Sequence, residues 1–166
     1  MDLSFLNKNE LDEGGILIVL VGPPGAGKST LAKEIADEFA DYDFTIICPD
    51  SIREELTGNP NDQDHNVEVF SKVYSRLATY LEQGYNVVYD ATNCRSTYRT
   101  KIVQIARNLA IKIICIVMTT PISECLEHNK NRDIRHVPEN VIENMYFTLK
   151  KHPPTIFEGY DMIVRA

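Results

Sequence analysis

A strand, a glycine-rich turn and a helix follow one another near the start of the chain, and this succession constrains the fold most. The run Ile16–Val21 is entirely apolar, as in a parallel strand that is covered on both faces. The helical spacing of Leu31, Ile35 and Phe39 predicts a helix from residue 28 to residue 39. Between the two lies a complete G-x-x-x-x-G-K-[ST] motif, formed by Gly22, Pro23, Pro24, Gly25, Ala26, Gly27, Lys28 and Ser29. In this context the motif predicts a phosphate-binding loop.

The chemistry of this loop predicts a nucleoside triphosphate as its ligand. Its glycines allow backbone N–H groups to surround a phosphate, and the N-terminus of the following helix adds partial positive charge. We expect Lys28 to reach the β and γ phosphates, Ser29 to offer its hydroxyl to Mg²⁺, and Thr30 to complete the nucleotide-binding set. ATP and Mg²⁺ are therefore the expected cofactors. A GTPase is disfavoured, because Arg132 occupies the aspartate position of the guanine-reading pattern N-K-x-D.

Strand and helix patterns alternate along the rest of the chain, which predicts an α/β fold. Further strands are expected at 45–48, 85–89 and 111–118, with an edge strand at 162–164. Helices are expected at 50–56, 67–81, 102–109, 121–130 and from 138 onward. Such alternation implies a parallel sheet of about four or five strands, covered by helices on both faces. We expect residues 1–13 to be a loose arm and residues 14–166 to form a single domain.

The charge and cysteine content narrow the possible functions. Lys and Arg number 17 against 24 Asp and Glu, a net charge of −7. Such a chain is poorly suited to coating long nucleic acids, where many phosphates must be neutralised, yet it can hold one strand end. The four cysteines show neither C-x-x-C nor zinc spacing, which predicts reduced, mostly buried thiols in a cytoplasmic protein. The longest apolar run is much shorter than the ~20 residues of a membrane helix, so no membrane partner is expected; the oligomeric state stays open.

Asp50 and Arg53 follow the second expected strand, at the sheet edge where a ligand crevice forms. Ser51 and Glu54 fit an S-x-x-E capping box, which would make Ser51 the helix cap and leave Asp50 outside the helix. Asp50 is then placed to orient an acceptor hydroxyl, which matters most in a loose phosphoryl-transfer transition state. Arg53, one helical turn on, is expected to hold a substrate phosphate bidentately. The alternative is a capped helix that carries only surface charges.

Asp90 ends the third expected strand, beside the phosphate-binding loop. We expect Asp90 to help hold Mg²⁺ together with Ser29, or else to orient Arg53 or the acceptor. The segment that runs from Asp90 through Thr92 to Asn93 also fits an Asx-type turn, in which side chains bond their own backbone. The two roles are compatible, because a turn that fixes Asp90 also presents it.

Two basic stretches lie in the second half of the chain. In residues 126–138, Arg132 and then Arg135 are the candidates for a mobile lid whose guanidinium reaches the β and γ phosphates. The same stretch also fits a solvated helix end, whose cations complement the helix dipole. Residues 93–112 hold no acidic residue and five cations that could steer a phosphate backbone, namely Arg95, Arg99, Lys101, Arg107 and Lys112.

In their order along the chain, these motifs resemble the polynucleotide 5′-hydroxyl kinase family, whose kinase domain is a P-loop kinase of the AAA_33 type. The resemblance runs from residue 16 to residue 161. It implies that Asp50 is the general base and that Arg53 clamps the phosphate 3′ to the terminal nucleoside. The family's D-x-T-N element is matched at Asp90, Thr92 and Asn93, and the resemblance places the last two on the substrate side.

The lid is similar to the family's R-N-x-x-R, matched at Asn129 and Arg132, followed by V-P at residues 137–138. His128 stands where the first lid arginine is expected. The lid would therefore depend on Arg132 alone or borrow Arg135, and His128 is expected to matter little. The family's phosphatase half has no counterpart here, so we expect a lone kinase, a piece of a larger repair protein or a relative with a changed substrate.

The resemblance implies an ATP-dependent kinase that phosphorylates the 5′-hydroxyl end of DNA or RNA. The alternative is a small-molecule kinase that acts on an antibiotic, a nucleoside or a sugar nucleotide. A nucleotide-dependent regulatory module without transfer chemistry is the third possibility, and Asp50 argues against it. Arg53 discriminates between the first two, because an acceptor without a phosphate has no use for it.

Overall fold

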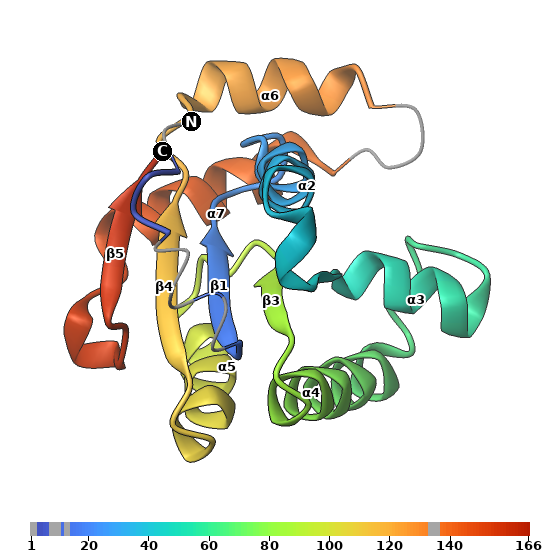
Figure 1. The fold of residues 1–166 in the computed structure, drawn as a ribbon. Helices are drawn as coiled ribbons and strands as arrows, with labels where there is room; N and C mark the ends of the chain where they lie inside the picture. The colour runs from blue at the N-terminus through green and yellow to red at the C-terminus, as the bar shows by residue number, and fades with distance from the viewer. Residues whose placement is uncertain (1–2, 7–10, 12–13, 133–136) are drawn as a thin grey trace.

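A five-stranded sheet forms the centre of the molecule, with the strand order β2-β3-β1-β4-β5 and every pair parallel (Figure 1). This computed structural model describes residues 3–6, 11, 14–132 and 137–166. The strands are β1 (Ile16–Val21), β2 (Phe44–Ile47), β3 (Asn86–Tyr89), β4 (Lys112–Val117) and β5 (Met162–Arg165). The predicted α/β fold with a parallel sheet is therefore confirmed, and so is the edge strand near residue 162.

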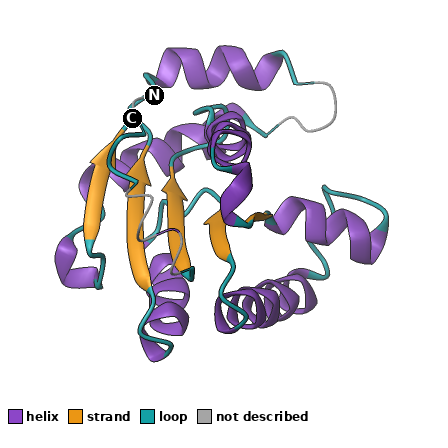
Figure 2. Cartoon of the chain, viewed as in Figure 1, coloured by secondary structure: helices purple, strands orange, loops and turns teal. Residues whose placement is uncertain are grey.

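Helices cover both faces of the sheet (Figure 2). They are α2 (Lys28–Glu38), α3 (Pro49–Thr57), α4 (Asn66–Glu82), α5 (Ser96–Asn108), α6 (Ile122–Lys130) and α7 (Glu139–Lys151), with short 3₁₀ turns η1 (Ala40–Tyr42) and η2 (Ile156–Glu158). Residues of α4, α5 and α7 share one core with the sheet, and residues of α2 share the other. Among the helices in the described ranges, none is long and apolar enough to cross a membrane.

The central position of β1 explains why this strand has no polar residue. All its side chains are buried, and they alternate between the two cores: Leu17 packs with α4 and α5, whereas Ile18 packs with α2. Burial on both faces favours an uninterrupted apolar run. The loop that follows β1 consequently leaves the sheet in its middle, between β3 and β4.

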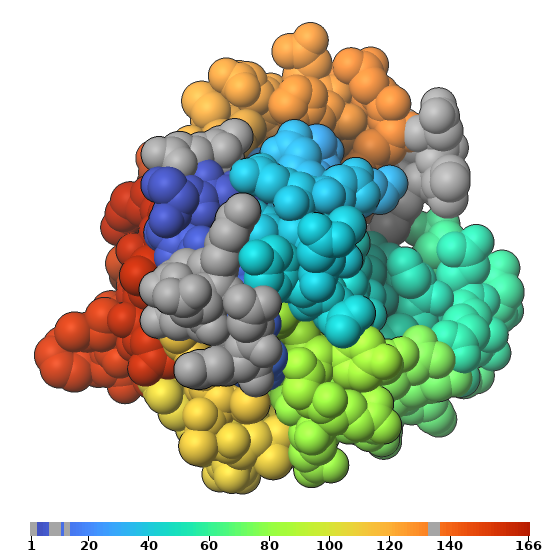
Figure 3. Space-filling model, in the orientation of Figure 1, coloured from blue at the N-terminus to red at the C-terminus, as the bar shows by residue number. Residues whose placement is uncertain are grey.

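The N-terminal segment differs from the loose arm that we expected. Leu3, Leu6 and Leu11 are buried in the same core as α2. Figure 3 shows the described part of this segment, in dark blue, lying between α2 and the C-terminal strand. Three leucines without helical or strand spacing give no periodic signal, but burying them stabilises the fold through the hydrophobic effect.

Candidate active site

The phosphate-binding loop spans residues 22–27 and joins β1 directly to α2. Gly27 is the residue before the helix and has φ +87°, a conformation that glycine adopts without strain. Gly25 has φ +82°, and a side chain at this position would collide with the carbonyl group of Cys125 in α6. The loop therefore lies in direct backbone contact with α6, which crosses the carboxyl end of the sheet (Figure 1).

Lys28 is the first residue of α2 and is only 7% exposed. Its Nζ donates a hydrogen bond of 2.8 Å to the carbonyl oxygen of Pro23, so the side chain folds back over the loop. Burial lowers the pKa of Lys28, while the nearby Asp90 carboxylate opposes the shift. Ser29 and Thr30 are exposed in the first turn of α2, where their hydroxyl groups are accessible.

Asp90 follows β3, the strand that pairs with β1, and is only 6% exposed. Its backbone N–H donates to the Ile47 carbonyl, which ties the ends of β2 and β3 together. Carboxylate and hydroxyl oxygens suit Mg²⁺, which also keeps waters and phosphate oxygens as ligands. Asp90 and Ser29 fit that role, and the described residues contain no cluster of three or more His, Cys, Asp or Glu for a metal held by protein alone.

The segment after Asp90 forms hydrogen bonds with the end of β1 and the start of the phosphate-binding loop. The Thr92 carbonyl accepts a 2.9 Å hydrogen bond from the Gly22 N–H. Asn93 has φ +50° and is 3% exposed, and its side-chain amide donates to the Leu20 carbonyl of β1 at 2.8 Å. This geometry corrects the substrate-binding role expected for Asn93, because its amide is used inside the fold.

The start of α3 also differs from expectation. The helix begins at Pro49, which suits the first helical position because proline lacks an N–H, and Cys48 precedes it. The predicted capping box at Ser51 is therefore wrong, and Asp50 lies inside the first turn rather than before the helix. An acidic residue in the first turn of a helix is favoured by the helix dipole.

Asp50 and Arg53 form an ion pair, which the sequence analysis did not predict. Arg53 Nη1 lies 2.6 Å from Asp50 Oδ1, and Nη2 donates to the Asn66 side chain of α4 at 2.9 Å. The Arg53 side chain is 4% exposed, whereas that of Asp50 is 44% exposed. The guanidinium is thus held between α3 and α4, and the carboxylate faces outward next to it. The third guanidinium nitrogen of Arg53, Nε, is buried without a partner among the described residues.

The lid candidates are only partly described. Arg132 lies just after α6, and its positive charge contributes to the lowered pKa of Lys28, so it acts electrostatically on the loop. Arg135 lies outside the described residues, as do the others from 133 to 136. Asn129 bonds both the N–H and the carbonyl group of Val137, at 3.0 and 2.9 Å, and so ties the two ends of this stretch together.

Arg99 is a residue whose role the sequence interpretation missed. Its side chain is fully buried and pairs with Glu158 through two hydrogen bonds of 2.7 Å. It also donates to the carbonyl groups of Asn93 and Cys94, in the segment behind the loop. The sequence did carry a signal for this burial: Arg99 lies at helical spacing from three apolar residues of α5 that are buried, namely Ile102, Val103 and Ala106.

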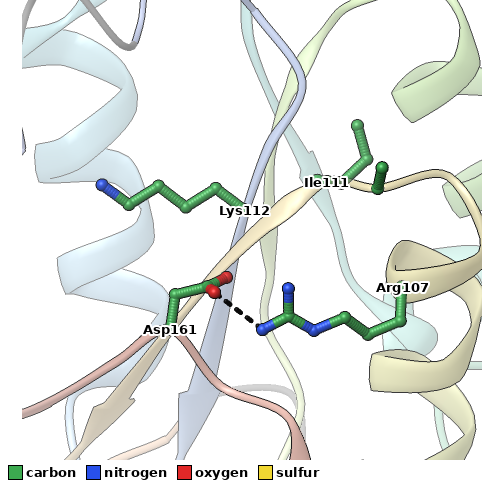
Figure 4. A pocket seen from close by; sticks show the side chains of 5 residues that line it. Arg107, Ile111, Lys112 and Asp161 are labelled. Atoms are coloured by element: carbon green, nitrogen blue, oxygen red, sulfur yellow. Dashed lines mark hydrogen bonds and ion pairs between the residues drawn. The ribbon is translucent and has the colours of Figure 1, made fainter.

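The expected basic steering surface is smaller than the sequence suggested. Arg99 is in the core, and Arg107 binds Asp161 and the Gly159 carbonyl, at 2.8 Å each. Figure 4 shows Arg107, Lys112 and Asp161 around a shallow pocket. Lys112 starts β4 and pairs with the first residue of β1, so this pocket lies at the end of the sheet away from the loop.

Comparisons with solved structures show the fold of P-loop kinases. A chain of the Pnkp1/Rnl/Hen1 RNA repair complex matches with TM-score 0.66 and 21% identity, over 88% of this chain and 47% of that one. A gluconokinase from Sinorhizobium meliloti 1021 matches with TM-score 0.58 and 21% identity, over 92% and 82% of the chains. Kti12 from Chaetomium thermophilum, in complex with ADP-AlF3, matches with TM-score 0.65 and 16% identity, over 90% and 88%. The chain thus spans about half the length of the RNA repair protein.

The family assignment rests on a match in sequence. No curated protein sequence matches the chain. The profile of the AAA_33 family, described as an AAA domain, matches residues 17–152. That range holds β1 from its second residue, the phosphate-binding loop, the Asp50–Arg53 pair, Asp90 and Arg132. With this match over most of its length and the five-stranded parallel sheet around the loop, the chain belongs to the AAA_33 family of P-loop kinase domains.

Proposed function

We propose that the protein is an ATP-dependent kinase that transfers the γ-phosphate to the 5′-hydroxyl end of a DNA or RNA strand. The observation that carries this proposal is the pairing of Asp50 with Arg53, at 2.6 Å, in the helix that follows β2 at the same edge of the parallel sheet as the phosphate-binding loop. The 5′ end of a DNA or RNA strand requires two groups: a base for its hydroxyl and a guanidinium for the neighbouring phosphate. The proposal takes residues 14–166 as one kinase domain.

In the proposed reaction, the acceptor oxygen forms a bond to the γ-phosphorus as the bond between that phosphorus and the bridging oxygen of ADP breaks. The hydroxyl proton passes to Asp50, whose side chain is 44% exposed and therefore accessible to an acceptor. Arg53 holds Asp50 in place through Nη1. Its buried Nε has no partner among the described residues, and a substrate phosphate oxygen would satisfy this donor after a small side-chain movement.

On the donor side, the loop N–H groups and Lys28 would hold the β and γ phosphates, and Arg132 would neutralise charge that develops during transfer. Mg²⁺, held by Ser29 and Asp90, would supply further neutralisation of the phosphates. The low exposure of Lys28 and Asp90 supports this assignment, because charges act more strongly where water is excluded.

A small-molecule acceptor is the second candidate, and the charges around Asp50 favour it. Arg53 is buried and already bonded to Asp50 and Asn66, so it is less available to a substrate phosphate than the sequence suggested. Glu55 of α3 is balanced by Lys72 and Arg76 of α4. Glu54 on α3 and Asp62 and Asp64 in the next loop give the region around α3 a negative character. Such a surface suits a neutral or cationic acceptor better than a long phosphate backbone.

The deciding experiment offers both acceptor classes to the same protein. The chain is incubated with γ-labelled ATP and Mg²⁺ together with DNA and RNA oligonucleotides that carry a 5′-hydroxyl. Matched oligonucleotides that carry a 5′-phosphate serve as the control, beside a nucleoside, an aminoglycoside and a sugar. Label on the 5′-hydroxyl strands alone would support the proposal, and label on a small acceptor alone would replace it with the second candidate.

Two variants test the assigned roles. Lys28→Ala should abolish labelling of every acceptor, yet the protein should still fold, because Lys28 bonds only a carbonyl of its own loop in the hydrogen bonds described. Arg53→Ala should impair both acceptors, because Arg53 holds Asp50, but it should raise KM much more for an oligonucleotide than for a nucleoside without a 3′ phosphate. Equal damage to both acceptors would remove the argument for a strand end.

A further inference from the structure

His128 makes a contact with the phosphate-binding loop that its sequence position does not suggest. Its Nδ1 lies 2.8 Å from the carbonyl oxygen of Gly25. A carbonyl oxygen only accepts hydrogen bonds, so Nδ1 must carry the proton and donate. Both the corresponding neutral tautomer and the charged imidazole carry that proton. The contact therefore does not need the positive charge of the arginine that the family resemblance leads us to expect at this position.

A second donor from the same part of the chain holds the next peptide of the loop. Thr120, just before α6, donates its hydroxyl to the Ala26 carbonyl at 2.9 Å. Between the two donors, the backbone of Cys125 touches Gly25 so closely that only glycine fits there. Thr120 and His128, at the two ends of the α6 segment, thus hydrogen-bond two successive carbonyl groups of the loop, those of Ala26 and Gly25.

These contacts fix which way the loop N–H groups face. In a planar trans peptide the C=O and the following N–H point in opposite directions. The His128 contact consequently fixes the Gly25–Ala26 peptide, whose N–H donates to the Pro23 carbonyl within the loop at 3.3 Å, and the Thr120 hydroxyl fixes the Ala26–Gly27 peptide. A phosphate-binding loop depends on such fixed peptide orientations, because its backbone N–H groups bind the ligand.

We propose that His128 is a positioning residue of the nucleotide site, which fixes the Gly25–Ala26 peptide of the phosphate-binding loop and holds the end of α6 at the loop. Arg132 lies one turn beyond His128, and its charge acts on Lys28, so the same bond sets the approach of Arg132 to the donor phosphates. This inference rests on the proposed function only in requiring that the loop binds a nucleotide.

Three variants test the inference. His128→Ala removes the donor, and His128→Asn restores one, because the amide nitrogen of asparagine occupies nearly the place of Nδ1. His152→Ala is the matched control, since His152 is also exposed and lies outside the loop contacts. The affinity for a fluorescent ADP analogue is measured by titration for each protein, together with KM for ATP and the thermal unfolding midpoint.

We expect His128→Ala to weaken ADP binding about three- to tenfold, as loss of one hydrogen bond predicts. His128→Asn should come within about twofold of the original affinity, and His152→Ala should leave it unchanged. The unfolding midpoint of His128→Ala should fall by no more than about 2–4 °C, as loss of one partly buried hydrogen bond predicts, and that of His152→Ala should stay the same. Unchanged ADP affinity in His128→Ala, or equal losses in His128→Ala and His128→Asn, would overturn the inference. Because ADP binding needs no acceptor, this result is independent of whether a strand end is phosphorylated.

Discussion

Replacing Arg99 with methionine should destabilise the protein severely, although the sequence presents Arg99 as one of several surface cations. The guanidinium donates five hydrogen bonds: two to Glu158 and one each to the carbonyl groups of Asn93, Cys94 and His152. Its side chain is 0% exposed, and the Glu158 side chain is 19% exposed. Arg99→Met keeps the length of the apolar stem but leaves this carboxylate and three carbonyl groups without their donor.

The magnitude follows from the burial of the pair. Removing one partner of a buried ion pair costs about 3–5 kcal/mol. Glu158 retains some solvent contact, which places the estimate near the lower end, at about 3 kcal/mol. The lost carbonyl partners raise it again by about 1 kcal/mol or more. Since a domain of this kind has a free energy of unfolding of about 5–15 kcal/mol, Arg99→Met should still fold but unfold at much lower denaturant concentration.

Urea unfolding followed by far-ultraviolet circular dichroism measures this change without a tryptophan, which the chain lacks. Arg95→Met is the matched control, because Arg95 precedes the same helix and is exposed; its effect should stay within about 0.5 kcal/mol. The double variant Arg99→Met/Glu158→Met should be less damaging than the sum of the two single variants, since it leaves no unpaired charge. A free energy of unfolding for Arg99→Met within about 0.5 kcal/mol of the original would refute the reasoning.

Three further expectations concern the site and its surroundings. Asp50→Asn should lower kcat by about 10²–10⁴ in steady-state assays, because it keeps the size of the side chain but removes the base; an unchanged kcat would exclude that role. Arg132→Ala should lower the single-turnover rate far more than it weakens ADP binding, and similar losses in both would make Arg132 a binding residue only. Burial raises the pKa of Cys94 to about 11 and that of Cys115 to about 12, so above about pH 8.5 these thiols ionise only in the unfolded state. The free energy of unfolding should therefore be fully retained at neutral pH and fall from about pH 8.5 toward 11 in urea titrations, and a constant value would contradict this.

The parts of the fold that the sequence predicted well are encoded locally. The run Ile16–Val21 and the loop motif place strand, turn and helix in immediate succession, and the structure has β1 at those residues and α2 from Lys28. The order of the remaining strands and helices was also predicted correctly, because each element carries its own apolar period. The start of α3 was missed because Pro49, as a helix-starting residue, competed with the S-x-x-E pattern that follows it.

The partners of the charged residues depend on contacts that are remote in sequence. Arg99 meets Glu158 across 59 residues, and His128 meets Gly25 across 103. A local pattern reports that a residue is charged but not whether the folded chain already supplies its counter-charge. The same limit applies to Asn93, whose buried contact with the Leu20 carbonyl no turn pattern reveals. The sequence therefore predicts which segments form the candidate site better than it predicts the hydrogen-bond and ion-pair partners of their side chains.

The distribution of these charges bears on how this acidic protein would act on phosphates in the proposed function. Several cations that the sequence offers for phosphate binding are engaged within the fold: Arg53 with Asp50, Arg99 with Glu158, and Arg107 with Asp161. Lys28, by contrast, lies in the loop region, and the positive charge of Arg132 contributes to lowering its pKa. In the proposed reaction, positive charge would thus be concentrated at the donor phosphates and sparse on the acceptor side. An acceptor would consequently be selected by the place of its hydroxyl beside Asp50 and by one contact with Arg53, rather than by attraction of a long phosphate backbone.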